Sequence, residues 1–192
     1  MFTAVLTGDL EGVKSVLASG VDVNGRDFDN LISYKWVALM HACELGNLDM
    51  AKLLIDLGAD VNVKENYGWT ALMIAGERGY IDIVRLLLDA GANINIKNNY
   101  GSTVLIITSR RGYTDIVRLL LDHGADVNVK DYNNMTALMF ASYYNHIDIV
   151  KLLLDHGADI TVKDNDGDTA LSIAIDCNNK DIVNLLKSYG VR

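Results

Sequence analysis

The chain has 192 residues, of which 50% are hydrophobic, and a formal net charge of −8. This hydrophobic fraction excludes general disorder, and an acidic chain lacks the basic surface that sequence-independent nucleic-acid binding requires. Its apolar runs fall short of the roughly 18 residues that span a membrane, and its first residues form no signal peptide, so we predict a cytoplasmic protein with neither a membrane nor a nucleic-acid partner.

A short helix pair is predicted at the N-terminus. Residues 1–6 and 10–17 are rich in apolar side chains, and Gly20 follows as a helix-terminating glycine. The first unit of the chain is therefore placed at 1–24, where it ends with the beginning of an extended segment.

An enlarged segment, 25–36, follows this pair. The interval from Gly20 to the next landmark glycine, Gly58, is longer than the constant interval that separates the later landmark glycines. The segment is unusually apolar for a surface loop, with Phe28, Leu31, Ile32, Tyr34 and Trp36. Two interpretations stay open, because insertions in repeat proteins often contribute to a binding face, and this one could equally fold over the N-terminal pair and shield it.

A repeated unit with a constant period runs along the rest of the chain, marked by Gly58, Gly91, Gly124, Gly157 and Gly190. A period of about 33 residues is typical of stacked supersecondary units, none of which buries its apolar face alone. The internal repeats are predicted at 37–66, 67–99, 100–132 and 133–165, with a terminal unit at 166–192. We expect the two outer units to be the capping repeats of a single, complete repeat domain.

The local pattern of one repeat predicts a turn, a short helix, a longer helix and an extended finger. Thr70 is placed as the N-cap of the first helix, which ends at Gly79. Asp82 is expected to open the second helix, which Gly91 ends. Residues 92–97 alternate apolar and polar side chains and are predicted to be extended.

This unit resembles the ankyrin repeat, and the resemblance covers the whole chain. The motifs that carry it are Thr70-Ala-Leu, Thr136-Ala-Leu, Thr169-Ala-Leu, Ile83-Val-Arg-Leu-Leu-Leu-Asp-Ala-Gly-Ala and Gly124-Ala-Asp-Val-Asn-Val-Lys-Asp. The proline and histidine of the family's Thr-Pro-Leu-His tetrapeptide are absent from every copy, so packing must replace the hydrogen bonds made there. The resemblance implies an all-α repeat solenoid, a curved stack of helix-turn-helix units with β-hairpin-like fingers.

The resemblance also implies where a partner binds, since the family uses its finger tips and the adjoining surface of the first helices. Tyrosine, tryptophan and arginine, the types enriched at interface hot spots, are frequent at those positions here. The partner-binding residues are therefore predicted to be Tyr34, Trp36, Tyr67, Trp69, Glu77, Arg78, Tyr100, Arg110, Arg111, Tyr132, Met135, Tyr143 and Tyr144. The alternative is that the finger aromatics pack against one another between repeats.

Charge is uneven along these positions. Arginines make the middle cationic, at Arg78, Arg110 and Arg111, and aspartates make the C-terminal end acidic, at Asp164, Asp166, Asp168 and Asp176. A partner with an acidic patch opposite the arginines is one interpretation, and ordinary solvated surface charge is the other.

Motifs for catalysis, metals or cofactors are not found. The run beginning at Asp164 is similar to the start of a calcium loop, but its twelfth position is Ile175 instead of a bidentate acid. His123 and His156 are equivalent positions one repeat apart, too distant to share a metal. Cys43 and Cys177 fall in different repeats and are expected to be reduced thiols. We therefore predict a non-enzymatic, monomeric protein-binding module without a cofactor.

Two alternatives of another kind remain. In some ankyrin proteins a finger asparagine is hydroxylated, and the matching positions here are Asn62, Asn95 and Asn128. Those side chains could instead bond their own finger backbone. The chain could also be a structural spacer that associates with itself through residues 25–36.

Overall fold

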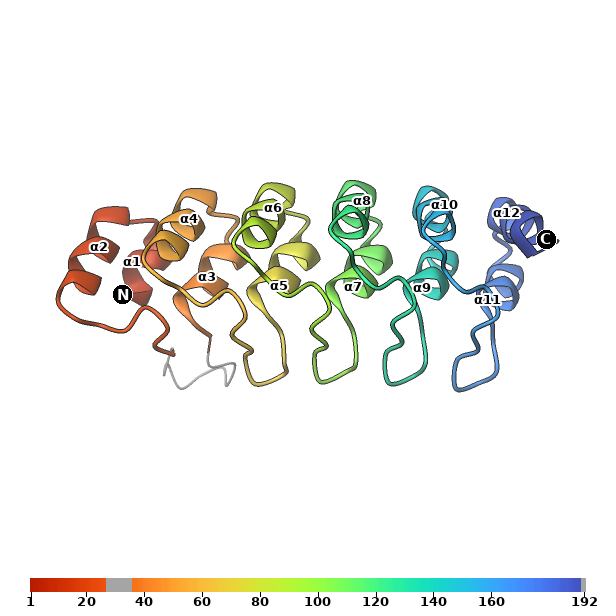
Figure 1. Cartoon of the computed structure of the whole chain (residues 1–192), viewed down its shortest axis with the longest axis horizontal. Helices are drawn as coiled ribbons and strands as arrows, with labels where there is room; N and C mark the ends of the chain where they lie inside the picture. The colour runs from red at the N-terminus through yellow and green to blue at the C-terminus, as the bar shows by residue number, and fades with distance from the viewer. Residues whose placement is uncertain (27–35, 191–192) are drawn as a thin grey trace. The chain divides into compact units, whose positions relative to one another are not determined.

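The computed structural model describes residues 1–26 and 36–190 (Figure 1). It consists of two compact units, Met1–Asn99 and Tyr100–Arg192, called here the N-terminal unit and the C-terminal unit. Among the described residues, the only β pairing is an isolated antiparallel bridge between Arg26 and Val37.

The N-terminal unit is a stack of antiparallel helix pairs. Its helices are α1 (Phe2–Thr7), α2 (Leu10–Ala18), α3 (Ala38–Glu44), α4 (Leu48–Asp56), α5 (Ala71–Arg78) and α6 (Ile81–Asp89). The first helices of the pairs pack side by side, α1 on α3 and α3 on α5, and the second helices α4 and α6 also pack together. The pairs therefore form two layers of helices, with the fingers projecting from one edge of the unit (Figure 1).

The C-terminal unit repeats the same arrangement. Its helices are α7 (Val104–Arg111), α8 (Thr114–Asp122), α9 (Ala137–Tyr143), α10 (Ile147–Asp155), α11 (Ala170–Asp176) and α12 (Lys180–Gly190). The helices α7, α9 and α11 form one layer, and α8, α10 and α12 form the other. The predicted all-α stack of helix pairs is thus confirmed in both units.

Four of the first helices, α5, α7, α9 and α11, begin at threonine caps, as predicted for Thr70, whereas α1 and α3 follow Met1 and Val37 without a side-chain cap. The hydroxyl of Thr70 accepts a hydrogen bond from Met73 N at 3.3 Å, and Thr136 does the same with Met139 N at 3.3 Å. Thr169 and Ser172 form a reciprocal capping box. These hydroxyls satisfy backbone N–H groups that have no partner within a helix, so the caps define where these four helices start.

The ends of the predicted helices are nearly correct. Gly79 ends α5 in the left-handed conformation, with φ of 80°, and Gly91 follows α6 with φ of 85°. The second helix, however, starts at Ile81 with Tyr80 as its N-cap, so Asp82 lies in its first turn instead of opening it. The carboxylate still lies at the positive end of the helix dipole.

The finger differs from the sequence prediction. Residues 92–97 are not continuously extended, because the side chain of Asn93 accepts a hydrogen bond from Asn95 N at 3.0 Å and turns the chain there. The finger tip is hairpin-like, as expected: Glu65 N donates to Trp69 O at 2.9 Å, and Gly68 N donates to Glu65 O at 2.9 Å.

Methionines fill three of the five positions where the family has its histidine, and Ile106 and Ser172 fill the other two. Met40, Met73 and Met139 are each at most 1% exposed. The unbranched thioether chain adapts to irregular space in a core. Packing therefore takes the place of the absent side-chain hydrogen bonds at the methionines, as predicted, whereas Ser172 still forms hydrogen bonds through its capping box with Thr169.

Candidate functional site

The finger tips are held by acidic side chains at their base. Glu65 is 6% exposed, and its Oε1 accepts hydrogen bonds from Tyr67 N at 2.8 Å and Trp69 N at 3.0 Å. Asp131 Oδ1 accepts from Asn133 N and Met135 N, both at 2.9 Å. A carboxylate that accepts two backbone N–H groups fixes a turn strongly.

A third acid, Asp164, repeats this geometry with Asp166 N at 3.0 Å and Asp168 N at 2.9 Å. This structural role was not predicted, and Asp164 was expected only to add negative charge, although the three acids recur at the period of the repeat, with Asn98 at the same position between Glu65 and Asp131. That spacing was the available signal.

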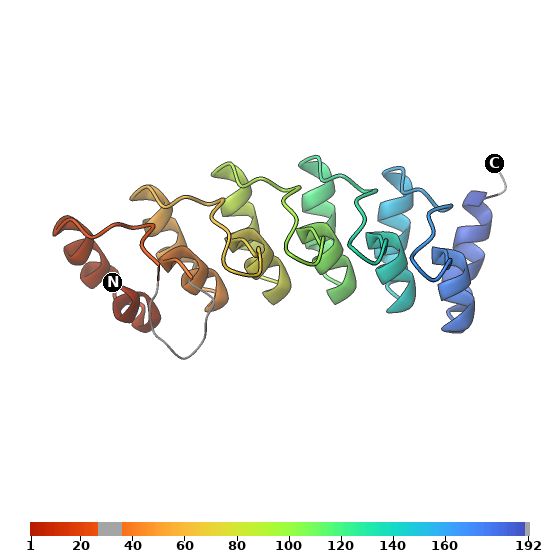
Figure 2. The same ribbon diagram turned by 90° about the horizontal axis from the view of Figure 1, so that it is seen from below.

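Neighbouring fingers are linked through their backbones. In the N-terminal unit Asn99 N donates to Tyr67 O at 2.9 Å. In the C-terminal unit Tyr132 N donates to Tyr100 O at 3.0 Å, and Asn165 N donates to Asn133 O at 3.1 Å. The finger tips within each unit thus form an ordered row, which Figure 2 shows from the finger side.

The tyrosines at the finger tips of both units are exposed. Tyr67 is 45% exposed, Tyr100 59% and Tyr132 69%. The ring of Tyr132 lies over the backbone of Gly101, where an added Cβ would be 2.8 Å from Tyr132 Cδ1. Tyr132 thus packs on the preceding finger with one part of its ring, and most of its side chain remains exposed to solvent. Met135, on the same finger, is half-buried.

A second aromatic group lies at the end of α9. The rings of Tyr143 and Tyr144 are 4.9 Å apart in an edge arrangement, and Tyr144 stacks with His146 at 6.2 Å. Tyr143 is 53% exposed and Tyr144 49%. The pair is thus a rigid aromatic surface one helix away from the finger tips.

Both tryptophans are half-buried. The ring of Trp36 lies 5.1 Å from that of His41, which in turn contacts Phe2 at 5.7 Å. Trp69 is half-buried at the base of its finger. Tyr34 lies outside the described residues, as does most of the segment 25–36.

The charge prediction requires a correction at Arg78. Its Nε donates to Glu44 Oε2 at 2.9 Å, and its Nη2 pairs with Glu44 Oε1. This hydrogen bond is the main cause of a raised pKa at Arg78. Arg78 is therefore neutralised by a carboxylate of the preceding helix pair and does not present a free positive charge.

The remaining predicted charges differ in exposure. Glu77 and Arg110 are half-buried, whereas Arg111 is exposed. At the acidic end Asp166 and Asp176 are exposed. Asp168 accepts a hydrogen bond from Ser172 Oγ at 2.9 Å, so one oxygen of its carboxylate is engaged by a side chain of its own repeat.

The finger asparagines bridge neighbouring repeats, so the idea that they bond only their own finger is wrong for two of them. Asn62 Oδ1 accepts from Asn93 N at 2.7 Å, and its Nδ2 donates to Gly91 O at 3.3 Å. Asn128 makes the same pair of bonds, to Asp159 N at 2.8 Å and Gly157 O at 3.2 Å. Each amide thus satisfies two backbone groups of the next repeat.

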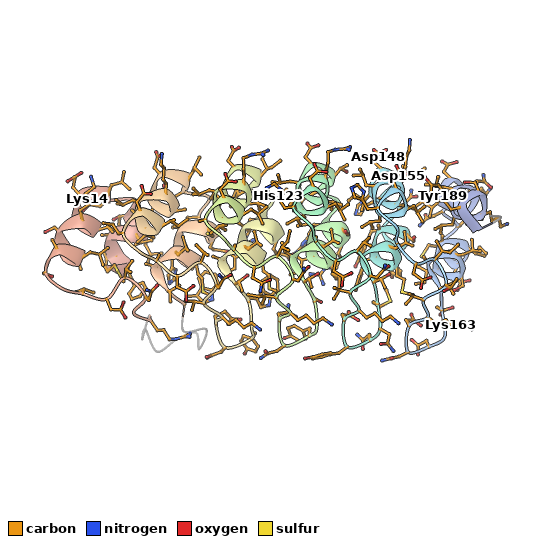
Figure 3. The ribbon with its side chains drawn as sticks, in the orientation of Figure 1. Lys14, His123, Asp148, Asp155, Lys163 and Tyr189 are labelled. Atoms are coloured by element: carbon orange, nitrogen blue, oxygen red, sulfur yellow. The ribbon has the colours of Figure 1, made fainter. Side chains whose placement is uncertain are left out.

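Cys43 and His123, which could in principle react or bind a metal, are held by burial and by a contact with the backbone. Burial raises the pKa of the Cys43 thiol far above its usual range. His123, labelled in Figure 3, lies 2.8 Å from Leu119 O through its Nδ1 at the end of α8. Within 1–26 and 36–190, no three His, Cys, Asp or Glu side chains are grouped so that they could hold a metal ion.

Helices long and apolar enough to cross a membrane are not found in the part of the chain that the structure describes.

The family model described as ankyrin repeats (3 copies) matches residues 1–98, 91–164 and 133–192. The chain belongs to the ankyrin-repeat family. Ankyrin repeats are in general protein–protein interaction modules.

Similar curated proteins are named "Ankyrin repeat, SAM and basic leucine zipper domain-containing protein 1". The one from Carollia perspicillata is 36% identical over 59 residues, which is 31% of this chain and 11% of the relative. The one from Mus musculus has the same identity and coverage. The one from Atelerix albiventris is 33% identical over 63 residues, 33% of this chain and 12% of the relative. The match thus covers about a tenth of the length of these relatives.

Proposed function

We propose that this ankyrin-repeat protein is a non-enzymatic module that binds a protein partner through its finger tips and the ends of its first helices. The observation that carries the proposal is the repeated exposure of tyrosine at the finger tips, from 45% at Tyr67 to 69% at Tyr132. Exposed large aromatic side chains at regular positions favour an interaction surface.

The rigidity of the fingers supports this proposal. The tyrosines stand on turns that acidic side chains such as Asp131 hold, and on backbone bonds between neighbouring fingers. A side chain that is already positioned loses less conformational entropy when a partner binds. Such a surface therefore favours binding over a role as a passive spacer.

The predicted residues divide by exposure into two groups. We propose that the exposed ones contact the partner directly: Tyr67, Tyr100, Arg111, Tyr132, Tyr143 and Tyr144. We propose that the half-buried ones support them: Trp36, Trp69, Glu77, Arg110 and Met135. We propose that Arg78 supports the surface by its ion pair with Glu44. Tyr34 lies outside the described residues and stays a prediction from the sequence.

The chemistry of the buried groups is consistent with a module that does not catalyse a reaction. The thiol of Cys43 is fully buried, and its raised pKa keeps it neutral. A neutral, inaccessible thiol is a poor nucleophile.

Site-directed photocrosslinking tests the proposal. A photoreactive phenylalanine analogue in place of Tyr132 should crosslink a specific protein in lysate of the source cells. The same analogue in place of Arg118, an exposed residue of α8 on the other helix layer, is the matched control. Equal crosslinking at the two positions, or none at Tyr132 with a natively folded protein, would contradict the assignment of this surface.

Hydroxylation of Asn62, Asn95 or Asn128 is the weaker candidate function. Two of these amides already bridge repeats, as shown above for Asn62 and Asn128. Intact mass spectrometry of the natural protein tests it, because each hydroxylation adds one oxygen atom. Self-association is tested separately by light scattering over a range of protein concentrations.

A further inference from the structure

The exposed surface of the C-terminal unit changes from aromatic to acidic between two neighbouring repeats. Tyr132, Met135, Tyr143 and Tyr144 form what we call the tyrosine ridge, on the finger before α9 and on the end of α9 itself. Residues 133–190, which contain most of this ridge and the described part of the chain after it, hold eight aspartates and four lysines. The ridge is thus set in a strongly acidic part of the chain.

A carboxylate stands one repeat beyond the tyrosine pair. Asp176 is the last residue of α11, which packs against α9, and it occupies the position equivalent to Tyr143 in the next repeat. The loop after Asp176 is tied to the end of α9, since Asn179 Nδ2 donates to Ser142 O at 2.8 Å and Tyr143 O at 3.4 Å. Asp176 is exposed.

The finger tips repeat this juxtaposition. Tyr132 is followed one finger later by Asn165 and Asp166, and Asn165 Nδ2 donates to Tyr132 O at 3.2 Å. Asp166 is exposed. At both levels an exposed tyrosine therefore neighbours an exposed carboxylate of the next repeat.

The four lysines of residues 133–190 lie outside the ridge itself. Lys163 lies on the chain that leads to the finger tip, and Lys180 is the first residue of α12. Lys151 lies in α10 and Lys187 in α12, both in the other helix layer. The surface is thus acidic on the side of α11, where Asp176 is exposed, whereas Arg110 and Arg111 lie on the other side, at the end of α7, which also packs against α9.

An acidic, tyrosine-rich surface selects for a cation with an apolar stem. The face of an aromatic ring carries negative electrostatic potential and attracts ammonium and guanidinium groups. A neighbouring carboxylate adds a second attraction and repels an anionic partner. The stem of a lysine or arginine can lie on apolar surface while its charged head reaches the acid.

We propose that the tyrosine ridge docks a basic segment of the partner, with an arginine or lysine head between the Tyr143–Tyr144 pair and Asp176. The proposal deepens the function proposed above and depends on it. The partner proposed here is basic at this site. The arginines in the sequence had suggested instead a partner with an acidic patch. The occupant is a peptide segment that combines a cationic residue with apolar neighbours.

Fluorescence anisotropy with three labelled peptides of equal length tests this proposal. They share apolar residues and differ at two positions, which hold arginine, asparagine or glutamate. The whole protein should bind the arginine peptide at least about fivefold more tightly than the asparagine peptide, and the glutamate peptide most weakly. The preference should shrink as salt is added, since screening weakens exposed charge pairs.

Variants then locate the site. D176N and Y143A should each weaken binding of the arginine peptide by about three- to fivefold, whereas Y143F, which keeps the ring, should retain it. D148N, in the first turn of α10 and labelled in Figure 3, removes the same charge from the other layer and should leave binding unchanged.

Several results would overturn the proposal. One is equal affinity of the protein for the arginine and asparagine peptides. Another is an equal loss of affinity for the arginine peptide in D176N and D148N, because binding would then depend only on the net charge of the protein. If the analogue at position 132 still crosslinked a partner in either case, the binding function would survive and only the basic occupant would be wrong.

Discussion

His146 packs over Gly112, in the loop between α7 and α8. The Nε2 atom of His146 lies 3.3 Å from Arg110 O, and a Cβ added to Gly112 would be 2.6 Å from His146 Cε1. Gly112 also has φ of 82°. Glycine is therefore required there twice, by the backbone conformation and by the approach of a ring from the next repeat. Tyr80 stands over Gly46 in the same way in the N-terminal unit.

Replacing Gly112 with alanine should therefore destabilise the protein more than replacing Gly124. Both have positive φ, 82° and 81°, but nothing lies within 4 Å of a Cβ at Gly124. G124A should cost about 1–2 kcal/mol of unfolding free energy from backbone strain alone, and G112A about 1–3 kcal/mol more from the clash. Urea denaturation measures both. Adding H146A to G112A should recover part of the difference, and equal costs for the two glycines would contradict the close packing.

Removal of a finger acid should destabilise the finger that it holds. D131A leaves the N–H groups of Asn133 and Met135 without their acceptor, which should cost about 1–3 kcal/mol. D131N keeps an acceptor oxygen, and asparagine stands at the same position in Asn98, so we expect a much smaller loss. D166A is the control on an exposed acid. Hydrogen exchange should quicken at the Asn133 and Met135 amides in D131A alone.

The buried thiol of Cys43 should be inert in the native protein. With Ellman's reagent, Cys177, which is half-buried, should react before denaturation, and Cys43 only after it. Because burial raises the pKa of Cys43, the native chain keeps a proton that the unfolded chain loses above about pH 9. Stability should therefore be unaffected by this group below that pH and should fall as pH rises beyond it. C43A should remove this fall, and a rapid native reaction of both thiols would contradict the burial.

Local structure was largely predictable from the sequence because its causes are local. A threonine accepts an N–H from three residues onward, as Thr70 and Thr136 do, and a glycine with positive φ ends a helix within its own turn, as Gly79 does. These signals depend on neighbours along the chain. The helix pairs and their period could therefore be inferred without coordinates, apart from the turn that Asn93 introduces into residues 92–97.

Contacts between repeats determine which candidate site residues are paired, buried or hydrogen-bonded. Arg78 was predicted to be part of a cationic stretch, and in the structure it pairs with Glu44 of the preceding repeat. Trp36 was predicted to contact a partner, and in the structure it is half-buried against His41. The amide of Asn62 reaches Gly91 and Asn93 instead of its own finger.

The repeat unit and its caps are thus properties of the sequence, since they follow from spacings shorter than one repeat or from the period itself. The family was also accessible from the sequence, through its resemblance to the ankyrin repeat in motifs such as Thr70-Ala-Leu. Which charges are free, which aromatics are exposed and which amides are used are properties of the tertiary structure. They depend on side-chain directions across the interface between one repeat and the next, and the distance between two residues along the chain does not specify those directions.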